Sequence, residues 1–233
     1  MKPRIFGALI HSSDRYISLM GSLVILLVAY PIMEELGRLD LYGAVVVFQL
    51  VVGVYSIGDS KKHLWTAAGL CLPGLALHLV ALFHPSRPIL LIGDGAVAIF
   101  FVYVIIIVYR AVLSETDFDQ NTIAGAVSVY LLLGLFWSVL YSMVWKLQPE
   151  SFASLPQTGD FGHSSSGQFL YFSFVTLTTL GYGDITPDTT LSQTLSWMEA
   201  VAGQLFVAVT VATLVGIRVA HYREEARSKR KPD

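Results

Sequence analysis

The sequence predicts an all-α membrane protein with six transmembrane helices and one shorter, re-entrant helix before the last of them. The chain is 54% hydrophobic and only 14% charged, with a mean hydropathy of +0.62, whereas a soluble protein carries roughly 25% charged residues. Six apolar stretches each approach the roughly 20 residues of helix that cross a bilayer core. A further apolar stretch, 168–180, has only thirteen residues, about 20 Å of helix, which is too short to cross.

Each of the six long stretches is predicted to be helical because backbone groups in lipid must form hydrogen bonds within their own segment. The predicted spans are 16–33, 41–57, 64–83, 89–109, 122–145 and 191–217. A cleaved signal peptide is the alternative for the first span, since Lys2, Arg4 and Arg15 precede it. That run is long and ends in Pro31-Ile32-Met33-Glu34-Glu35 without a small-residue cleavage pattern, which favours a retained span.

Basic residues in the short loops predict the orientation of the chain. With a cytoplasmic N-terminus, twelve of the fifteen Lys and Arg residues lie inside, and only Arg38, Arg87 and Lys146 lie outside. Six spans return the C-terminus to the cytoplasmic side of the cell membrane. The single cysteine, Cys71, lies inside the third span and is interpreted as a small buried hydrophobe rather than a redox group.

A polar connector at 110–121 divides the spans into two groups, and a short tail follows the second group. Residues 1–112 form a predicted four-helix transmembrane domain, 113–220 a two-span domain, and 221–233 a short basic cytoplasmic tail. The two later spans are separated by a long gap, 146–190, and long loops are usually functional. The first half of this gap is rich in Ser, Gly and Pro and predicts an exposed turret, while its second half is the re-entrant helix.

The re-entrant helix is followed directly by Thr179-Leu180-Gly181-Tyr182-Gly183-Asp184. This motif resembles the T-V-G-Y-G-D selectivity filter of tetrameric potassium channels. The resemblance covers residues 120–220: 176–179 and the pair Tyr171-Phe172 are similar to the family's pore helix, 129–134 to its outer helix, and Glu199, 203–204 and 214–216 to its inner helix. It implies a homotetramer with one central pore.

Elementary chemistry explains why such a filter needs these residue types. A desolvated cation must regain oxygen ligands, and backbone carbonyls can supply them. Successive carbonyls can point one way only if alternate residues accept a positive φ, which Gly181 and Gly183 do without steric cost. One strand cannot surround an ion, so four copies on a closed axis are expected.

By resemblance, the carbonyls of Thr179, Leu180, Gly181 and Tyr182 coordinate K⁺, and Gly183 lies at the outer mouth. Asp184, Tyr171 and Thr178 are expected to support the filter. Tyr171 replaces a Trp that commonly bonds the filter Asp, so a hydrogen bond from the Tyr171 hydroxyl to Asp184 is predicted. Val175 occupies a position where some bacterial members carry a buried Glu. Acidic residues on the outer side should concentrate cations: Glu150, Asp160, Asp184 and Asp188.

The layout of six spans also resembles voltage-gated channels, but the sensor charges are missing. A voltage sensor needs several gating charges within its fourth span. Here that span holds no Arg or Lys until Arg110, at its cytoplasmic end. The sequence therefore argues against ordinary voltage gating.

Two polar residues of the first four spans leave alternatives open. Asp94 is either a functional, possible regulatory carboxylate within the membrane or a hydrated group near the interface. His78 is interpreted as a satisfied core histidine in preference to a proton sensor. Glu199, in the last span, is expected by resemblance to support the pore rather than bind ions.

The last span carries the expected gate. Gly203 is similar to the family's hinge glycine, with close helix packing as the alternative. Helical spacing from Gly203 predicts a cavity face formed by Val207, Thr210 or Val211, and Leu214. The basic tail after it is either a positive-inside anchor, which is favoured, or a site for anionic lipid.

These features predict a potassium-selective channel that conducts K⁺ passively, without voltage gating. Two alternatives are a cation transporter subunit and a non-conducting membrane sensor with a relic pore loop. No metal-ligand spacing, nucleophile with a base or phosphate loop occurs in the sequence, so no enzyme activity, no cofactor and no nucleic-acid partner are expected. K⁺ is expected only as the permeant ion.

Overall fold

The computed structural model describes residues 15–36, 49, 52–53, 61–84, 86–114, 119–155 and 164–228. Helices dominate this part of the chain, with a single 3-10 turn and one pair of two-residue strands. The elements are α1 (Arg15–Glu35), α3 (Lys61–Phe83), α4 (Arg87–Ser114), α5 (Gln120–Leu147), η2 (Pro149–Ser151), β1 (Phe152–Ala153), α6 (Ser164–Leu177), β2 (Thr186–Pro187) and α7 (Thr190–Ser228). The predicted second span, 41–57, lies almost entirely outside the described residues.

Four described helices, α1, α4, α5 and α7, are long and apolar enough to cross a membrane. Two shorter apolar helical stretches occur at Trp65–Ala81, within α3, and Gly167–Leu177, within α6. In the sequence the apolar run of α3 continues through Leu64, Leu82 and Phe83, after Lys61, Lys62 and His63 in its first turn. The structure thus agrees with a multi-pass helical membrane protein, whereas the number of spans, six, stays a prediction.

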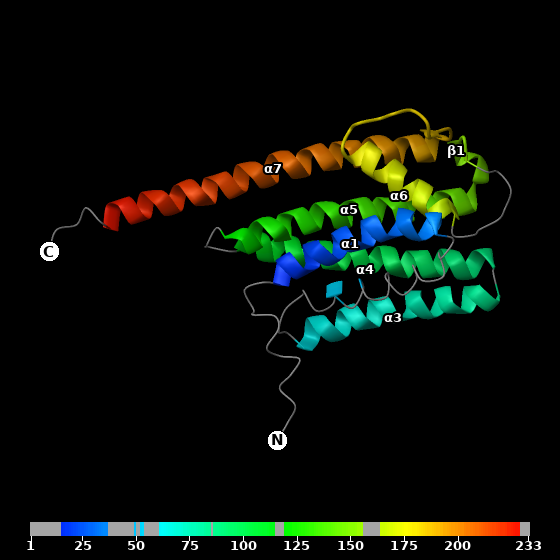
Figure 1. Ribbon diagram of the computed structural model, residues 1–233, viewed down its shortest axis with the longest axis horizontal. Coiled ribbons are helices and arrows are strands. Elements are labelled where there is room, and N and C mark those ends of the chain that lie inside the picture. Colours follow the sequence, from blue (N-terminus) through cyan, green and yellow to red (C-terminus); the bar gives the residue numbers. More distant parts are fainter. Residues whose placement is uncertain are drawn as a thin grey trace, which may run out of the picture.

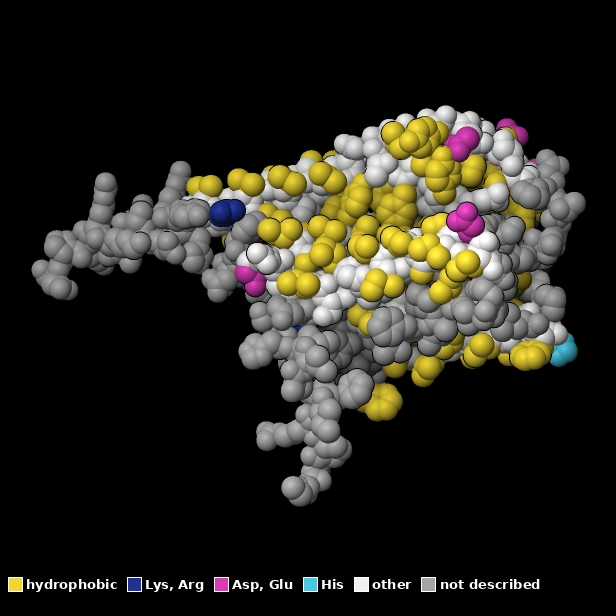
Figure 2. Space-filling view, in the orientation of Figure 1, with side chains coloured by type: hydrophobic (Ala, Val, Ile, Leu, Met, Phe, Trp, Pro, Cys, Tyr) yellow, Lys and Arg dark blue, Asp and Glu magenta, His cyan; other side chains and the backbone are white. Residues whose placement is uncertain are grey.

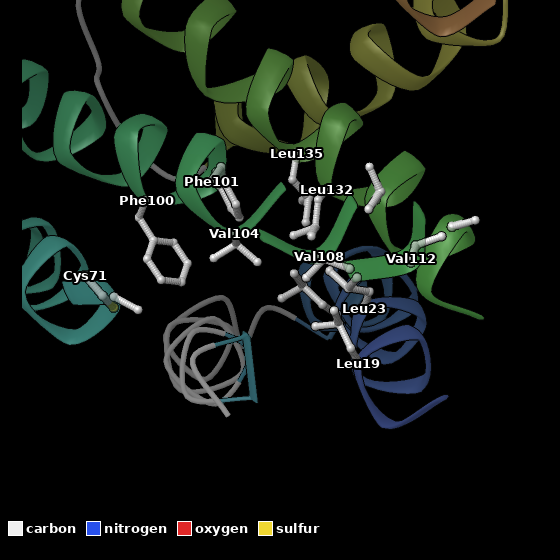
Figure 3. Close-up of a cluster of buried hydrophobic side chains, with 14 of the residues drawn as sticks. Leu19, Leu23, Cys71, Phe100, Phe101, Val104, Val108, Val112, Leu132 and Leu135 are labelled. Carbon is white, nitrogen blue, oxygen red and sulfur yellow. The ribbon is translucent and has the colours of Figure 1, made fainter. Parts of the chain in front are cut away.

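The described helices that precede α5 are α1, α3 and α4, and we call them the peripheral helices. Helix α4 packs against both α3 and α5, and α1 packs against α5 and appears between α5 and α4 in the view of Figure 1. Leu19 and Leu23 of α1 meet Val104 and Val108 of α4 in one buried cluster, which Leu132 of α5 joins (Figure 3). Helix α5 is therefore part of this core and also packs against α6 and α7.

Cys71 of α3 is buried at the edge of the same cluster and forms no disulfide. Its surroundings are apolar, with Phe100 of α4 nearby in Figure 3. This placement agrees with the interpretation of Cys71 as a small buried hydrophobe.

Helix α7 extends well beyond the rest of the described chain (Figure 1). It continues to Ser228, so the first residues of the predicted tail, 221–228, are helical. The sequence there, HYREEARS, is rich in Ala, Arg and Glu, which are good helix formers. Only 17% of the apolar window of α7 is buried within the subunit, and hydrophobic side chains line its outside in Figure 2.

Candidate functional site

The re-entrant helix is present as α6, but it ends three residues earlier than predicted. The sequence predicted a helix over 168–180, whereas α6 runs from Ser164 to Leu177. Thr178 and Thr179 form a turn. Thr179 has φ +59°, which no right-handed helix can contain. The stretch after Leu177 is therefore an irregular segment, 179–183, that leaves the helix end. We call it the filter strand, or the strand, by analogy with the expected filter, and it is distinct from β1 and β2.

Three alternate residues of this strand have a positive φ: Thr179 at +59°, Gly181 at +59° and Gly183 at +79°. The two glycines adopt the conformation predicted from their lack of a side chain. Thr179 is the unexpected member, because a β-branched residue rarely enters this region. Such strain persists only where the surrounding structure imposes it, and it is typical of functional sites.

Amide groups of the strand turn back toward the end of α6. The amides of Leu180 and Gly181 both donate to the carbonyl oxygen of Val175, at 2.9 and 3.2 Å. In a planar trans peptide the carbonyl points opposite to the amide. The carbonyls of Thr179 and Leu180, which share peptide units with these amides, consequently point away from their own pore helix. Among the described residues no hydrogen bond reaches them.

The outer end of the strand is held by the predicted pair. The Tyr171 hydroxyl donates to the Asp184 carboxylate at 2.6 Å, which confirms the contact expected from the sequence. The Tyr171 ring also stacks against Tyr182, with ring centroids 6.5 Å apart and planes tilted by 6°. Donation from Tyr171 lowers the pKa of Asp184 below its usual value. The carboxylate is therefore held in its charged form beside the strand.

The inner end of the strand has weaker contacts. The hydroxyl of Thr178, another expected support residue, donates to the Phe174 carbonyl at 2.6 Å and so caps the end of α6. The side-chain amide nitrogen of Gln204 on α7 donates to the Thr179 hydroxyl at 3.4 Å. Thr178 and Thr179 are both exposed in the subunit.

A small clamp, not predicted from the sequence, fixes the loop that follows the strand. Strand β1 pairs with β2 in antiparallel fashion. The carbonyl oxygen of Ser151 accepts from the Asp188 amide and from the Ser192 hydroxyl, both at 2.8 Å. Phe152 is 1% exposed, so the start of the predicted exposed turret is instead buried packing. Strands of two residues are too short to be predicted from the periodicity of the sequence.

Aromatic side chains fill the space between α5 and α6. Phe172 meets Tyr141 and Phe152 edge-on, with centroids 4.9 and 5.4 Å apart. Phe169 packs against the same Phe152 and against Trp145. We call this set the aromatic cluster; its buried members are Trp137, Tyr141, Val144, Trp145, Phe152, Leu155, Phe169, Phe172 and Leu177. The two adjacent residues of the aromatic pair thus pack in different places. Tyr171 faces the strand, whereas Phe172 lies in the aromatic cluster.

A buried carboxylate joins the three helices of this domain. Glu199 of α7 is completely buried. It accepts hydrogen bonds from the hydroxyl of Tyr141 on α5 and, at 2.6 Å, from that of Ser173 on α6. Ser173 also lies 2.7 Å from the carbonyl of Gly134 on α5. Glu199 therefore lies behind the pore helix, where the resemblance expected it, and supports rather than lines the strand.

Gly203 lies where α7 touches the end of α6. A Cβ atom at this position would lie 2.4 Å from the carbonyl oxygen of Leu177, so only glycine allows the approach. Helix α7 continues through Gly203 without a break. This contact explains why residue 203 is a glycine. It supports close helix packing, which was the alternative to the predicted hinge.

The predicted cavity face is split by the structure. Thr210 and Leu214 are buried within the subunit, at 4% and 8% exposure, on the packed side that Gly203 shares. Val207 and Val211 are exposed, at 45% and 56%. The expected cavity face is therefore wrong for Leu214, and of the alternatives Thr210 and Val211 only Val211 is exposed. The error arose because the stripe from 203 to 214 spans about 100° of the helix circumference, enough to reach both a packed and an open side.

Polar side chains of α1 and α4 also contact α6 and α5. The Tyr30 hydroxyl of α1 accepts a hydrogen bond from the Gly167 amide at the start of α6, at 3.0 Å. A Cβ atom at Gly167 would overlap the Tyr30 ring. Asp94 of α4 is buried and paired with Lys146 of α5 and His78 of α3. The interpretation of Asp94 as a hydrated surface group is thereby excluded.

Comparison with known proteins places the strand within a recognised domain. Residues 122–218, from the start of α5 into α7, match a family model described as ion channel. This is an ion-channel family and not an enzyme family. The match covers less than half of the chain.

Curated relatives include the voltage-gated potassium channel regulatory subunit KCNF1 of Rattus norvegicus, Mus musculus and Homo sapiens. Each is 28% identical over 103 residues, which is 43% of this chain and 19% of the relative. The chain thus matches about a fifth of the length of these relatives. No solved structure matches the chain.

The contact between Tyr171 and Asp184 yields a prediction with a pH dependence. Because the folded-state pKa of Asp184 is lowered, its stabilisation is present above the ordinary value of about 4 and is lost as the pH falls through the lowered value. Replacing Tyr171→Phe removes the donor. We expect the melting temperature of Tyr171→Phe to lie below that of the wild type at pH 7, with a difference that shrinks below about pH 4.

The matched control for this series is Tyr130→Phe, whose hydroxyl donates at 3.3 Å to the backbone carbonyl of Leu177, a group that does not titrate. It should show no such narrowing between pH 3 and 7. A deficit of Tyr171→Phe that stays constant across this range would contradict the assignment.

Ser173→Ala tests the Glu199 connection. It leaves one oxygen of a buried carboxylate without its donor, which costs about 1–3 kcal/mol of unfolding free energy. Ser138→Ala is the matched control, because Ser138 on α5 bonds only Leu135, within its own helix. Denaturation of the solubilised protein should separate the two serines. Equal stability of the two variants would rule out a bridging role for Ser173.

Gly203→Ala is expected to displace the end of α6, since the added methyl group would meet the backbone of Leu177. Gly216→Ala, farther along α7, adds a methyl group into open space within the subunit. We expect Gly203→Ala to lower the melting temperature by several degrees and Gly216→Ala to leave it nearly unchanged. If Gly203 acted only as a hinge, the Gly203→Ala protein would be as stable as the wild type.

Proposed function

We propose that this chain, whose residues 122–218 match an ion-channel domain and are related to potassium channel subunits, assembles as a homotetramer into a K⁺-selective pore. The observation that carries the proposal is the strand 179–183. Its alternate residues have positive φ, and its first carbonyls point away from the pore helix. Within the described part of the chain no group donates to these oxygens, which suits them to replace the water shell of an ion.

The exposure of the strand supports assembly around it. Leu180 and Tyr182 are 56% and 67% exposed in the subunit, at the end of a helix too short to cross the membrane. Backbone without internal hydrogen bonds is tolerated at this depth only where it lines a cavity or is covered by protein. Four copies on a closed axis would provide both, with Thr179, Leu180, Gly181 and Tyr182 as ligands of K⁺.

Helix α6 adds an electrostatic contribution. Its C-terminal end carries the negative pole of the helix dipole and adjoins the inner end of the strand. In a tetramer four such ends converge and favour a cation below the filter. On the outer side, Glu150, Asp184 and Asp188 are exposed acidic residues that would raise the local cation concentration.

We further propose that conduction is passive and that the channel is not gated by voltage. Helix α4 contains no basic residue between Arg87 and Arg110. Near its outer end it carries Asp94, which is already paired with Lys146. A buried pair of opposite charges moves no net charge across the membrane field. The four-helix domain of residues 1–112 is thus expected to be a support for the pore domain, 113–220.

The proposed location is the cell membrane, with both termini in the cytoplasm, as the distribution of Lys and Arg favours. The helical end of α7 would then leave the membrane on the inner side, where the basic residues of the tail could contact anionic lipid.

The name of the relatives favours one alternative. They are regulatory subunits of voltage-gated potassium channels, so a chain of this kind could act without conducting by itself. A transporter subunit is less well supported, since the chain has one pore loop with both glycines and Tyr182 in place.

Purified protein in liposomes should distinguish these functions. We expect K⁺-driven flux that does not saturate like a carrier and exceeds Na⁺ flux strongly. Gly181→Ala should abolish this selectivity because alanine at φ +59° is strained, whereas Gly21→Ala, in open space on α1, should not. Flux that saturates like that of a carrier would favour the transporter subunit. A tetrameric particle without any ion flux would favour the regulatory subunit.

A further inference from the structure

Three ionisable side chains meet where α3, α4 and α5 approach one another. The Asp94 carboxylate of α4 lies 2.5 Å from the Lys146 ammonium of α5 and 3.1 Å from Nε2 of His78 on α3. The side chains of Asp94 and Lys146 are only 8% and 10% exposed, whereas that of His78 is 40% exposed. We call this set the Asp94 cluster. It joins two peripheral helices to the helix that supports the pore segment.

Glycines make the cluster possible. A Cβ atom at Gly93 would lie 2.8 Å from Nδ1 of His78, so the imidazole can lie flat against α4 only because residue 93 has no side chain. Gly74, one turn before His78, lets α3 approach Val97 of α4 in the same way. The close approach of α3 and α4 therefore brings His78 to Asp94.

Both ring nitrogens of His78 face oxygen acceptors. Nδ1 lies 2.9 Å from the carbonyl oxygen of Gly74, and Nε2 lies 3.1 Å from the Asp94 carboxylate. A neutral imidazole has one N–H, whereas the protonated ring has two. Only the imidazolium can donate to both oxygens, so this geometry is complete when His78 carries a proton. In the neutral ring, one nitrogen lone pair faces an oxygen lone pair.

Among the described residues, the charged groups that face His78 are Asp94 from α4 and Lys146 from α5. Helix α3 contributes only the Gly74 carbonyl. Loss of the proton leaves Asp94 and Lys146 as a neutral pair and removes one of the two contacts of His78. The helices α3 and α4 then lose part of their attachment at this end, while the link from α4 to α5 remains.

The cluster is connected to the loop beyond the filter strand. Lys146 lies in the last turn of α5, directly before η2. Ser151 at the end of η2 accepts from the Asp188 amide at 2.8 Å. The path from Lys146 to the segment that follows Asp184 therefore consists of five residues of chain and one hydrogen bond.

We propose that His78 and Asp94 form a proton-binding site on the outer side of the membrane, and that its occupancy adjusts the attachment of the peripheral helices to the pore domain. The effect on current rests on the proposed channel function. His78 is exposed enough to exchange protons with solvent, and histidine is the side chain that titrates between roughly pH 5 and 8.

The first test records K⁺ current across a bilayer that contains oriented protein, with the pH changed on one side at a time. We expect the wild-type current to change between roughly pH 5 and 8 on the outer side only. His78→Gln should conduct without this dependence, because the amide of glutamine can donate at every pH. His84→Gln and His63→Gln are matched controls on the same α3–α4 unit and should respond like the wild type.

A double variant guards against the loss of folding. Asp94→Asn alone would leave the buried Lys146 without its partner, which is strongly destabilising. Asp94→Asn combined with Lys146→Met removes both charges and should also abolish the outer pH response. A wild-type channel without any outer pH response, or a His78→Gln channel with a wild-type response, would overturn the proposal.

A second measurement needs no conduction, and so separates a failure of this proposal from a failure of the proposed function. The melting temperature of the wild type should exceed that of His78→Gln most at pH 5, and the difference should shrink toward pH 8, because only the protonated ring fills both acceptors. His84→Gln should follow the wild type. A difference that does not vary with pH would overturn the site, whether or not the protein conducts.

Discussion

The carbonyl oxygen of Val175 is the point on which the pore segment depends. Two successive amides of the strand, those of Leu180 and Gly181, turn back to it, and this reversal sends the paired carbonyls outward. The strand cannot hold such a conformation by its own hydrogen bonds. Thr179 in particular is strained, and strain of this kind persists only when neighbouring structure imposes it.

Support for the strand comes from three directions. At its outer end, Tyr171 bonds Asp184 and stacks on Tyr182. Behind the helix, the aromatic cluster and the buried Glu199 fix α6 against α5 and α7. Below, the backbone of Leu177 lies directly against Gly203. Each of these contacts uses a different chemistry.

The peripheral helices also contact the elements that hold the strand. Tyr30 of α1 accepts from the first turn of α6, and Asp94 of α4 pairs with the last turn of α5. Both contacts lie on the outer side of the predicted membrane orientation, near the ends of the pore helix and outer helix. The peripheral helices thus contact the first turn of α6 and the last turn of α5, the two elements that flank the filter strand and the clamp beyond it.

The sequence by itself determined the membrane class, the short helix and the strand, because hydropathy, segment length and the glycine spacing at 181 and 183 are local properties. It also predicted the contact from Tyr171 to Asp184, through resemblance. Only the tertiary structure decided the rest. The partners of Glu199 lie 26 and 58 residues away along the chain. Those of Asp94 lie 16 and 52 residues away. No periodicity in the sequence links such positions. The same limit explains why Thr210 and Leu214 were assigned to the open face of α7: helical spacing fixes which residues share a side, but the neighbours that cover that side come from other helices.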